Sequence, residues 1–501
     1  MDFSTLRALA AGNSWGAVLP ELLLGCLALA LLVLEIALPK DAHKRIPMFS
    51  IAGQVAILGL LLANFSVPTV ETFNGLLMQS PTGQLFRVFF LLSSILVTVL
   101  ARVSLSRQPG PRVEFHHIVL VVSAAAMLLV QSRNFIMLFV TLETMTIGLY
   151  ILVSYYRTNS RTLEAGLKYL VMGALSSALL LFGIVLLYGS AGNPLLPGST
   201  PDAMQFAALN GFLAANPHNF LAGAGIVLVL SGIAFKIGGF PFQIWVPDVY
   251  EGAPTPVTAF LAVASKAAGF VVLLVLVENF APYHWLVEPV LAAMAAATII
   301  FGNLAALKQH NVKRLLGLSG VSHAGFILLA VASVGTVPGA EGAVYFYLFA
   351  YLIASFAVFG VMTALAGADD TNQELSDYSG LGRRSPFLSG ILACGLGSLA
   401  GIPPFAGFMG KLFVFVVAFK AGHFGLLLVA IAGVVVSIYY YFGWIRAAFF
   451  SDASTDNNPE PADATTANTS LTLRVALAAL AAASIILGFY QGPLGRLVSG
   501  S

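Results

Sequence analysis

The feature that most constrains this chain is a series of apolar runs, each about twenty residues long, that continues from one end to the other. A helix that rises 1.5 Å per residue crosses about 30 Å of hydrocarbon in a run of that length. The composition agrees, because 58% of the residues are hydrophobic and only 9% are charged, against about 25% charged in soluble domains. The sequence therefore predicts an all-α polytopic membrane protein without a soluble domain.

We expect about fourteen transmembrane helices, each long enough to span the bilayer. Their approximate limits are 17–38, 46–65, 83–105, 115–132, 134–155, 163–188, 220–246, 255–278, 287–306, 313–334, 342–366, 387–419, 423–448 and 471–490. Most lysines and arginines of the loops follow odd-numbered spans, and cytoplasmic loops are enriched in these residues. This asymmetry predicts that both termini lie on the outer side of the membrane.

Two of these spans contain similar helix breaks, FKIGGFPFQIW at residues 235–245 and LAGIPPFAGFMGKLF at residues 399–413. We expect interruptions at Gly238–Pro241 and Ile402–Pro404, with the freed carbonyls satisfied by protein or water and facing the lysines. The two spans are five helices apart and enter from opposite sides, which is typical of inverted repeats. The alternative is chance, because glycine and proline are common in membrane helices.

The repeat interpretation divides the chain into four parts. They are an N-terminal three-helix segment at 1–113, a first five-helix repeat at 114–280 containing helices 4–8, a second, inverted repeat at 281–450 containing helices 9–13, and a polar linker with a C-terminal helix at 451–501.

One glutamate and four lysines of the predicted spans are the candidates for chemistry: Glu143, Lys168, Lys236, Lys266 and Lys411. A charge at mid-membrane costs about 2.5–3.5 kcal/mol on insertion scales, so such residues face a partner or water. We expect Glu143 to approach Lys236, because a pair that separates and re-forms couples protonation to geometry, as a proton relay requires. The alternative is a static ion pair that fixes helix register. One glutamate cannot neutralise four lysines, which favours the relay.

Lys266 has no acid in its own span, since Glu278 lies about 18 Å further along the helix axis. We expect it to carry protons between Lys236 and Lys411. His323, in LSGVSHAGFILL, is the candidate neutral shuttle between them. The alternative for His323 is a hydrogen-bonded core histidine.

Lys168 is a weaker candidate, because Glu164 lies one turn before it and the two residues could form a solvated pair at the interface. Glu21 and Glu35, near the ends of the first span, are expected to be solvated. The two cysteines, Cys26 and Cys394, lie in apolar runs, which argues against iron–sulfur ligation, structural zinc or a disulfide framework. The sequence thus predicts no metal and no bound cofactor in this chain.

Several of these stretches together resemble the antiporter-like membrane subunits of respiratory complex I. They are LETMTIGLYILV, LEAGLKYLVMGALSSALLLFG, FKIGGFPFQIWVPDVYEGAPTPVTAFLAVASK, NLAALKQHNVKRLLGLSGVSHAGFILL and LAGIPPFAGFMGKLF. The resemblance covers about residues 114–450, whereas the first three spans and the tail agree only in hydropathy and number.

The resemblance implies a proton-translocating subunit that redox chemistry in other subunits drives. It implies that Glu143 and Lys236 form a controlling ion pair, that Lys266 with His323 is a central relay, and that Lys411 is a gate toward the outer side. NADH, FMN, iron–sulfur clusters and quinone would bind to partners, which include neighbouring antiporter-like subunits in a bacterial inner membrane. The alternatives are a subunit of a cation/proton antiporter complex or membrane-bound hydrogenase, and a structural spacer. No nucleic-acid partner is expected.

Overall fold

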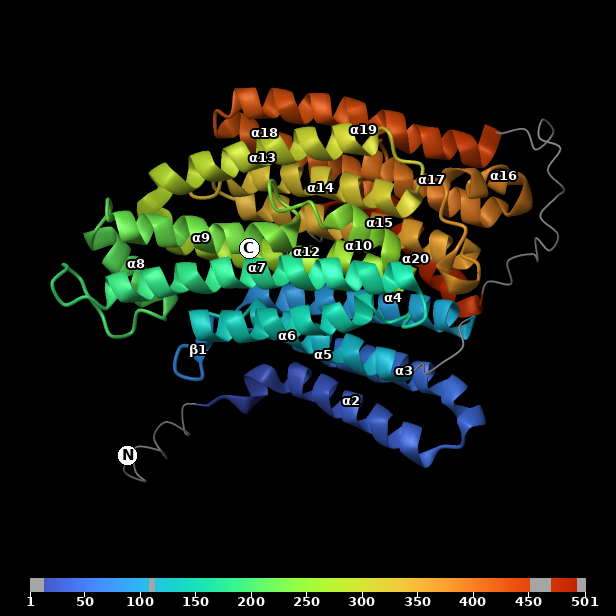
Figure 1. The fold of residues 1–501 in the computed structure, drawn as a ribbon, viewed down its shortest axis with the longest axis horizontal. Helices are drawn as coiled ribbons and strands as arrows, with labels where there is room; N and C mark the ends of the chain where they lie inside the picture. The colour runs from blue at the N-terminus through green and yellow to red at the C-terminus, as the bar shows by residue number, and fades with distance from the viewer. Residues whose placement is uncertain (1–12, 108–112, 451–469, 493–501) are drawn as a thin grey trace.

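The computed structural model describes residues 13–107, 113–450 and 470–492, and most of them lie in α-helices that run side by side in one bundle (Figure 1). The predicted polar linker falls on residues 451–469, which lie outside these ranges. Twelve helical stretches of the described residues are long and apolar enough to cross a membrane. The all-α polytopic fold predicted from the sequence is therefore confirmed.

The long helices before the first break are α2 (Leu19–Ala37), α3 (Ile46–Ala63), α4 (Pro81–Ser106), α5 (Val113–Leu129), α6 (Phe135–Val153), α7 (Ser160–Ala191) and α9 (Phe220–Ile237). Those after it are α12 (Lys266–Asn279), α13 (His284–Ala306), α14 (Val312–Val331), α15 (Ala340–Leu365), α17 (Pro386–Ala400), α18 (Ala406–Lys420), α19 (Phe424–Phe450) and α20 (Leu471–Phe489). The predicted span 115–132 forms the 17-residue α5, and the predicted span 387–419 forms two helices, α17 and α18.

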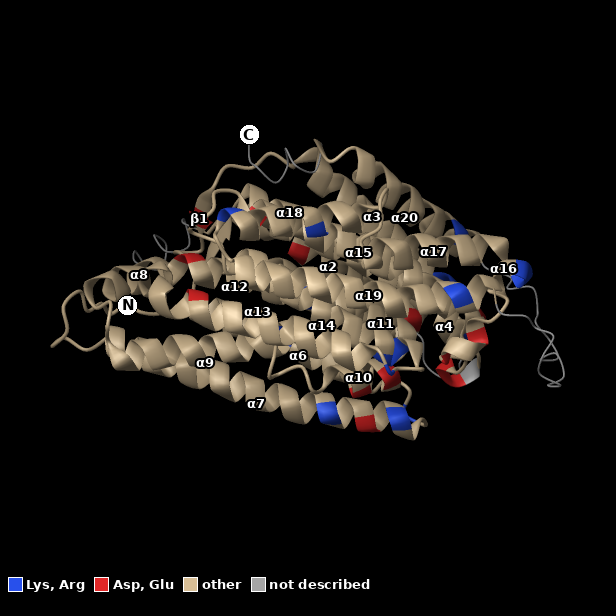
Figure 2. Cartoon of the chain, turned by 90° about the horizontal axis from the view of Figure 1, so that it is seen from above, with Lys and Arg blue, Asp and Glu red and all other residues tan. Residues whose placement is uncertain are grey.

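Shorter elements connect the spans. The strands β1 (Val70–Thr72) and β2 (Leu77–Gln79) form an antiparallel hairpin, and α8 (Phe206–Ala215) lies at the same end of the bundle in Figure 1. At the opposite end is α16 (Leu381–Arg384). Blue and red segments gather around α10 and α16, while long tan stretches separate the two ends (Figure 2). Charge is thus concentrated toward the helix ends, as a bilayer requires.

The seventh predicted span is interrupted where the sequence predicts. Helix α9 ends at Ile237, and Gly238 follows with φ of 71°. This left-handed conformation at a helix end favours glycine, which has no Cβ to clash with the backbone. The chain then turns into the short helix α10 (Val246–Gly252).

The twelfth predicted span is interrupted in the same way, since α17 ends at Ala400, Gly401 has φ of 83°, and α18 begins at Ala406. Both predicted breaks are confirmed. In Figure 1, α9 and α18 lie in the left half of the bundle and α10 and α17 in the right half, so the chain crosses the two breaks in opposite directions. The repeat boundaries themselves stay a prediction.

A further irregularity was not predicted. The eighth span consists of α11 (Thr255–Phe260), a π-helical turn η3 (Leu261–Ser265) and α12, which begins with Lys266. A π-bulge inside an α-helix is frequent at functional sites, because it redirects the side chains that follow. This span, α14 and α15 are the most buried of the bundle, with 94% of the most apolar stretch buried in each. They form its core.

Candidate functional site

Three of the four lysines predicted within spans are buried in the bundle. Lys236 on α9 is 3% exposed, and Lys266 on α12 and Lys411 on α18 are each 4% exposed. Within the described residues, none of the three forms an ion pair with a carboxylate. Their ammonium groups are satisfied instead by hydroxyl and main-chain carbonyl oxygens.

Lys236 donates a hydrogen bond to the hydroxyl of Thr146 on α6. That hydroxyl itself donates to the carbonyl of Leu142 at 2.6 Å, so toward Lys236 it can only accept. Glu143 lies one turn from Thr146, and its Oε1 accepts a hydrogen bond from Ser177 of α7 at 2.6 Å. Among the described residues Glu143 and Lys236 form no ion pair, and each is held by a hydroxyl, Ser177 for the carboxylate and Thr146 for the ammonium. Their approach stays a prediction.

Lys266 lies directly after the π-helical turn η3 and points toward α14 and α15. Its Nζ donates to the carbonyl of Gly320 at 2.6 Å and lies 3.4 Å from the Tyr351 hydroxyl. The Nζ is also 4.9 Å from the centroid of the Tyr351 ring, a cation–π contact. As the sequence indicates, no acid pairs with Lys266 among the described residues.

His323 on α14 lies between two tyrosines that the sequence analysis did not identify. Its Nδ1 is 2.7 Å from the Tyr347 hydroxyl, and its Nε2 is 3.1 Å from the Tyr441 hydroxyl. Its ring centroid lies 5.0 Å from that of Tyr351, which contacts Lys266, and 6.2 Å from that of Phe326, which contacts Lys411. His323 is thus both a hydrogen-bonded core residue and a polar group between two lysines, so the two interpretations of it are compatible.

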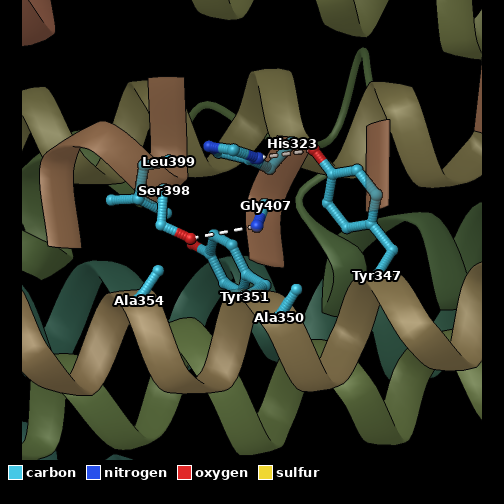
Figure 3. A pocket seen from close by; sticks show the side chains of 8 residues that line it. All are labelled: His323, Tyr347, Ala350, Tyr351, Ala354, Ser398, Leu399 and Gly407. Atoms are coloured by element: carbon cyan, nitrogen blue, oxygen red, sulfur yellow. Dashed lines mark hydrogen bonds between the residues drawn. The ribbon is translucent and has the colours of Figure 1, made fainter. Parts of the chain in front are cut away.

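A small cavity adjoins His323, Tyr347, Tyr351 and Ser398 (Figure 3). The volume open to the centre of a water molecule is about 10 Å³, so the cavity has room for roughly one water. Figure 3 shows the hydrogen bond between His323 and Tyr347 at one edge of the cavity. The spacing of Tyr347 and Tyr351, one helical turn apart within an apolar span, is the sequence signal that could have identified them.

Lys411 is coupled to the helix break that precedes it. Its Nζ donates to the carbonyl of Ala400, the last residue of α17, at 2.8 Å and lies 5.3 Å from the Phe326 ring centroid. The freed carbonyl therefore faces a lysine at this break, as expected. At the other break, the carbonyl of Phe235 is satisfied by protein, because it accepts a hydrogen bond from the indole of Trp245 at 3.2 Å. That the freed carbonyls there face the lysines stays a prediction.

The structure does not bring Lys168 together with the buried lysines. Its side chain is 44% exposed and pairs with Glu164 at 2.8 Å and with Asp248 at 2.6 Å. Arg314 in turn pairs with Asp248 at 2.7 Å and with Glu251 at 2.8 Å. Burial alone would raise the pKa of Asp248, but hydrogen bonds from Lys168 and Arg314 outweigh it and hold that pKa below its usual range. Lys168 belongs to a charged network at the rim of the bundle.

Two buried ion pairs were missed by the sequence analysis. Arg87 donates to both carboxylate oxygens of Glu21, at 2.7 and 3.0 Å, and both side chains are almost fully buried. The expectation that Glu21 is solvated was therefore wrong. Lys313 similarly pairs with Asp370. The two residues of each pair are more than fifty positions apart in the sequence. Hydropathy, which is a local property, therefore gives no signal for these pairs.

No group of three or more histidine, cysteine or acidic side chains in the described ranges is arranged to hold a metal ion. Cys26 and Cys394 are free thiols.

A family model described as "NADH:quinone oxidoreductase/Mrp antiporter, TM" matches residues 132–437. A curated relative from Opitutus terrae, named NADH-quinone oxidoreductase subunit N 1, is 64% identical over 99% of both chains. Its similarity extends over the three N-terminal helices as well as the two breaks.

Among solved structures, a chain of respiratory complex I from Thermus thermophilus with bound aureothin is 31% identical and superimposes with a TM-score of 0.77, covering 96% of this chain and 100% of that one. A chain of the archaeal membrane-bound sulfane sulfur reductase, at 24% identity, has the same fold with a TM-score of 0.80, covering 97% of this chain and 96% of that one.

Proposed function

This chain belongs to the NADH:quinone oxidoreductase/Mrp antiporter family of membrane subunits, and on that premise we propose that it is a proton-translocating membrane subunit of NADH:quinone oxidoreductase. Redox chemistry in other subunits supplies the driving force. The observation that carries the proposal is the series of buried lysines and a histidine, none of them neutralised by a carboxylate contact among the described residues. Unpaired ionisable groups in a membrane interior are characteristic of proton relays.

Lys266, Tyr351 and His323 form the centre of the proposed route. The carbonyl of Gly320 can only accept a hydrogen bond, so it holds the ammonium but cannot take its proton. The Tyr351 hydroxyl both accepts and donates, and it lies beside the cavity that has room for about one water. A proton released by Lys266 passes through this hydroxyl or a water to His323. The neutral imidazole accepts at one nitrogen and donates from the other.

Lys411 is the gate toward the outer side. Its ammonium is held by the terminal carbonyl of α17, so its hydrogen bond depends on the geometry of the break between α17 and α18. A small movement of either half-helix changes that contact. Lys236 and Glu143 are the controlling pair: Thr146 holds the lysine and Ser177 holds the carboxylate, and a shift of α6 against α7 alters the distance between the charges.

The chain works within an assembly. The side chain of Glu143 is only partly buried by this chain alone, and an ionised carboxylate in contact with lipid is costly. Other membrane subunits, including neighbouring antiporter-like subunits, therefore cover this face. NADH, FMN, iron–sulfur clusters and quinone bind to partner subunits, and this chain holds none of them. The complex lies in a bacterial inner membrane with both termini of this chain on the periplasmic side.

Substitution of Lys266 tests the proposal in the whole complex, reconstituted into liposomes. Lys266→Ala should lower the proton flux roughly a hundredfold or more, the usual contribution of a proton-transfer group. Lys266→Arg should fail as well, because guanidinium does not release its proton near neutral pH. Lys308→Ala, at an exposed position, is the matched control. A normal proton-to-electron ratio in Lys266→Arg would show that Lys266 is only a fixed charge.

A further inference from the structure

The ammonium of Lys266 occupies a place that exists because residue 320 has no side chain. A Cβ built on Gly320 would lie 2.9 Å from the Lys266 Nζ and 3.0 Å from the Tyr351 hydroxyl oxygen. Apart from its own turn of helix, no other atom of the described residues lies within 4 Å of that position. A methyl group here would therefore meet only the two polar groups of the central relay.

We propose that Gly320 is a positioning residue: its bare Cα admits the Lys266 ammonium to a seat formed by the Gly320 carbonyl and the Tyr351 hydroxyl. The inference rests on the proposed function, because it assigns the residue that sets the geometry of the central lysine.

The backbone gives no other reason for glycine at this position. Gly320 lies inside α14 with ordinary helical dihedral angles, and a glycine there destabilises a helix by about 0.5–1 kcal/mol relative to alanine. Other glycines of the same helix pair have a packing role. A Cβ on Gly325 would lie 2.8 Å from the main-chain nitrogen of Ile299, and one on Gly302 would lie 2.6 Å from that of Ser322. Those two glycines allow α13 and α14 to approach each other, whereas Gly320 does not.

Gly401 beside Lys411 provides a useful contrast. A Cβ on Gly401 would lie 2.7 Å from the Lys411 Cδ and 3.2 Å from its Nζ, but its φ of 83° also requires glycine. An alanine at Gly401 would thus strain the backbone and displace the lysine at once. Of these two glycines, Gly320 is the one where an alanine would displace the lysine without straining the backbone.

Displacing the ammonium has a chemical consequence. The seat offers one acceptor that cannot exchange protons, the Gly320 carbonyl, and one group that can, the Tyr351 hydroxyl. The 3.4 Å separation of Nζ from this hydroxyl is already at the long limit of a hydrogen bond. A methyl group between them would lengthen the contact, and a misplacement of about 1 Å in a reacting group can cost a hundredfold in rate.

The experiment compares three glycine-to-alanine variants of this chain within the complete complex in liposomes. Gly320→Ala should assemble normally, retain the quinone KM, and lower the proton flux roughly tenfold to a hundredfold. Gly325→Ala, which meets backbone, should lower assembly and thermal stability. A Cβ on Gly443 of α19 would have no neighbour within 4 Å, so Gly443→Ala should change neither the proton flux nor the thermal stability. Normal pumping by Gly320→Ala, in a complex where Lys266→Ala abolishes it, overturns the inference and leaves the proposed function intact.

A double variant keeps the inference testable if Gly320→Ala lowers stability instead. In Lys266→Ala the ammonium is gone and only the Tyr351 hydroxyl remains for the new methyl to meet, so adding Gly320→Ala should cost less thermal stability there than it does in the wild type. An equal loss of stability with and without Lys266 shows that the methyl meets something else, which also overturns the inference. Normal pumping by Lys266→Ala alone contradicts the proposed function, whereas this stability comparison remains valid because it measures a contact.

Discussion

The Nζ of Lys411 lies 2.8 Å from the carbonyl oxygen of Ala400, the last residue of the preceding half-helix. Gly401 takes a left-handed conformation directly after Ala400, so that carbonyl is free of the helical hydrogen-bond ladder. A broken membrane helix must satisfy such groups internally, and here a lysine does so. The break and the buried charge therefore stabilise each other.

Removing Lys411 should stop pumping without preventing assembly. Lys411→Ala leaves the Ala400 carbonyl without its ammonium but leaves no carboxylate unpaired, so the membrane subunits should still assemble. We expect the proton flux of the reconstituted complex to fall by roughly a hundredfold. Lys420→Ala, on the exposed end of the same helix, is the control and should pump normally. Pumping by Lys411→Ala at the wild-type rate would exclude Lys411 as a gate.

Thr146 should contribute to the proton flux, because its hydroxyl holds the ammonium of Lys236. Thr146→Val keeps the shape of the side chain but removes the hydroxyl that accepts from Lys236. We expect roughly a tenfold loss of proton flux, since the lysine then lacks its fixed position. The matched control is Thr144→Val, because Thr144 lies on the exposed face of α6 and bonds only its own helix at Val140. Equal effects of the two substitutions would contradict a specific role for Thr146.

The charged network at the rim should make stability depend on pH through Asp248. Its pKa in the folded protein is held below the usual range by Lys168 and Arg314. Asp248 therefore stabilises the protein above its unfolded pKa of about 3.9, and this contribution is lost as pH falls through the lower folded pKa. The difference in thermal stability between the wild type and Asp248→Asn should be present at pH 7 and shrink below about pH 4.

Asp202→Asn, at an exposed loop position, is the control for this series and should show no pH-dependent difference. A difference for Asp248→Asn that stays constant down to pH 3 would show that its ion pairs do not stabilise the protein.

The Arg87–Glu21 pair should be a structural contact between the N-terminal helix α2 and α4. Arg87→Ala leaves the Glu21 carboxylate buried without its bidentate partner, a change that typically costs about 3–5 kcal/mol. We expect a clear drop in the unfolding temperature of the solubilised complex. Arg157→Ala is the control, because Arg157 and Glu114 form an exposed pair at 3.9 Å that contributes little. An unfolding temperature unchanged by Arg87→Ala would show that water or another group satisfies Glu21.

The sequence alone determined the class of the fold, the two helix breaks and three of the lysines that are buried in the bundle. Each of these depends on local properties. Hydropathy over about twenty residues decides whether a run can span a bilayer, and glycine and proline decide where a helix can end. The cost of a charge in hydrocarbon identified Lys236, Lys266 and Lys411 as residues that need partners.

The tertiary structure alone decided which partners these residues have. Lys236 and Lys168 both lie in apolar runs, but only Lys236 faces the bundle interior, because hydropathy does not specify how a helix is rotated about its axis. Helix packing brings Gly320 to Lys266 across 54 positions and Tyr441 to His323 across 118. Such contacts arise from the arrangement of whole helices, so no local pattern in the sequence contains them.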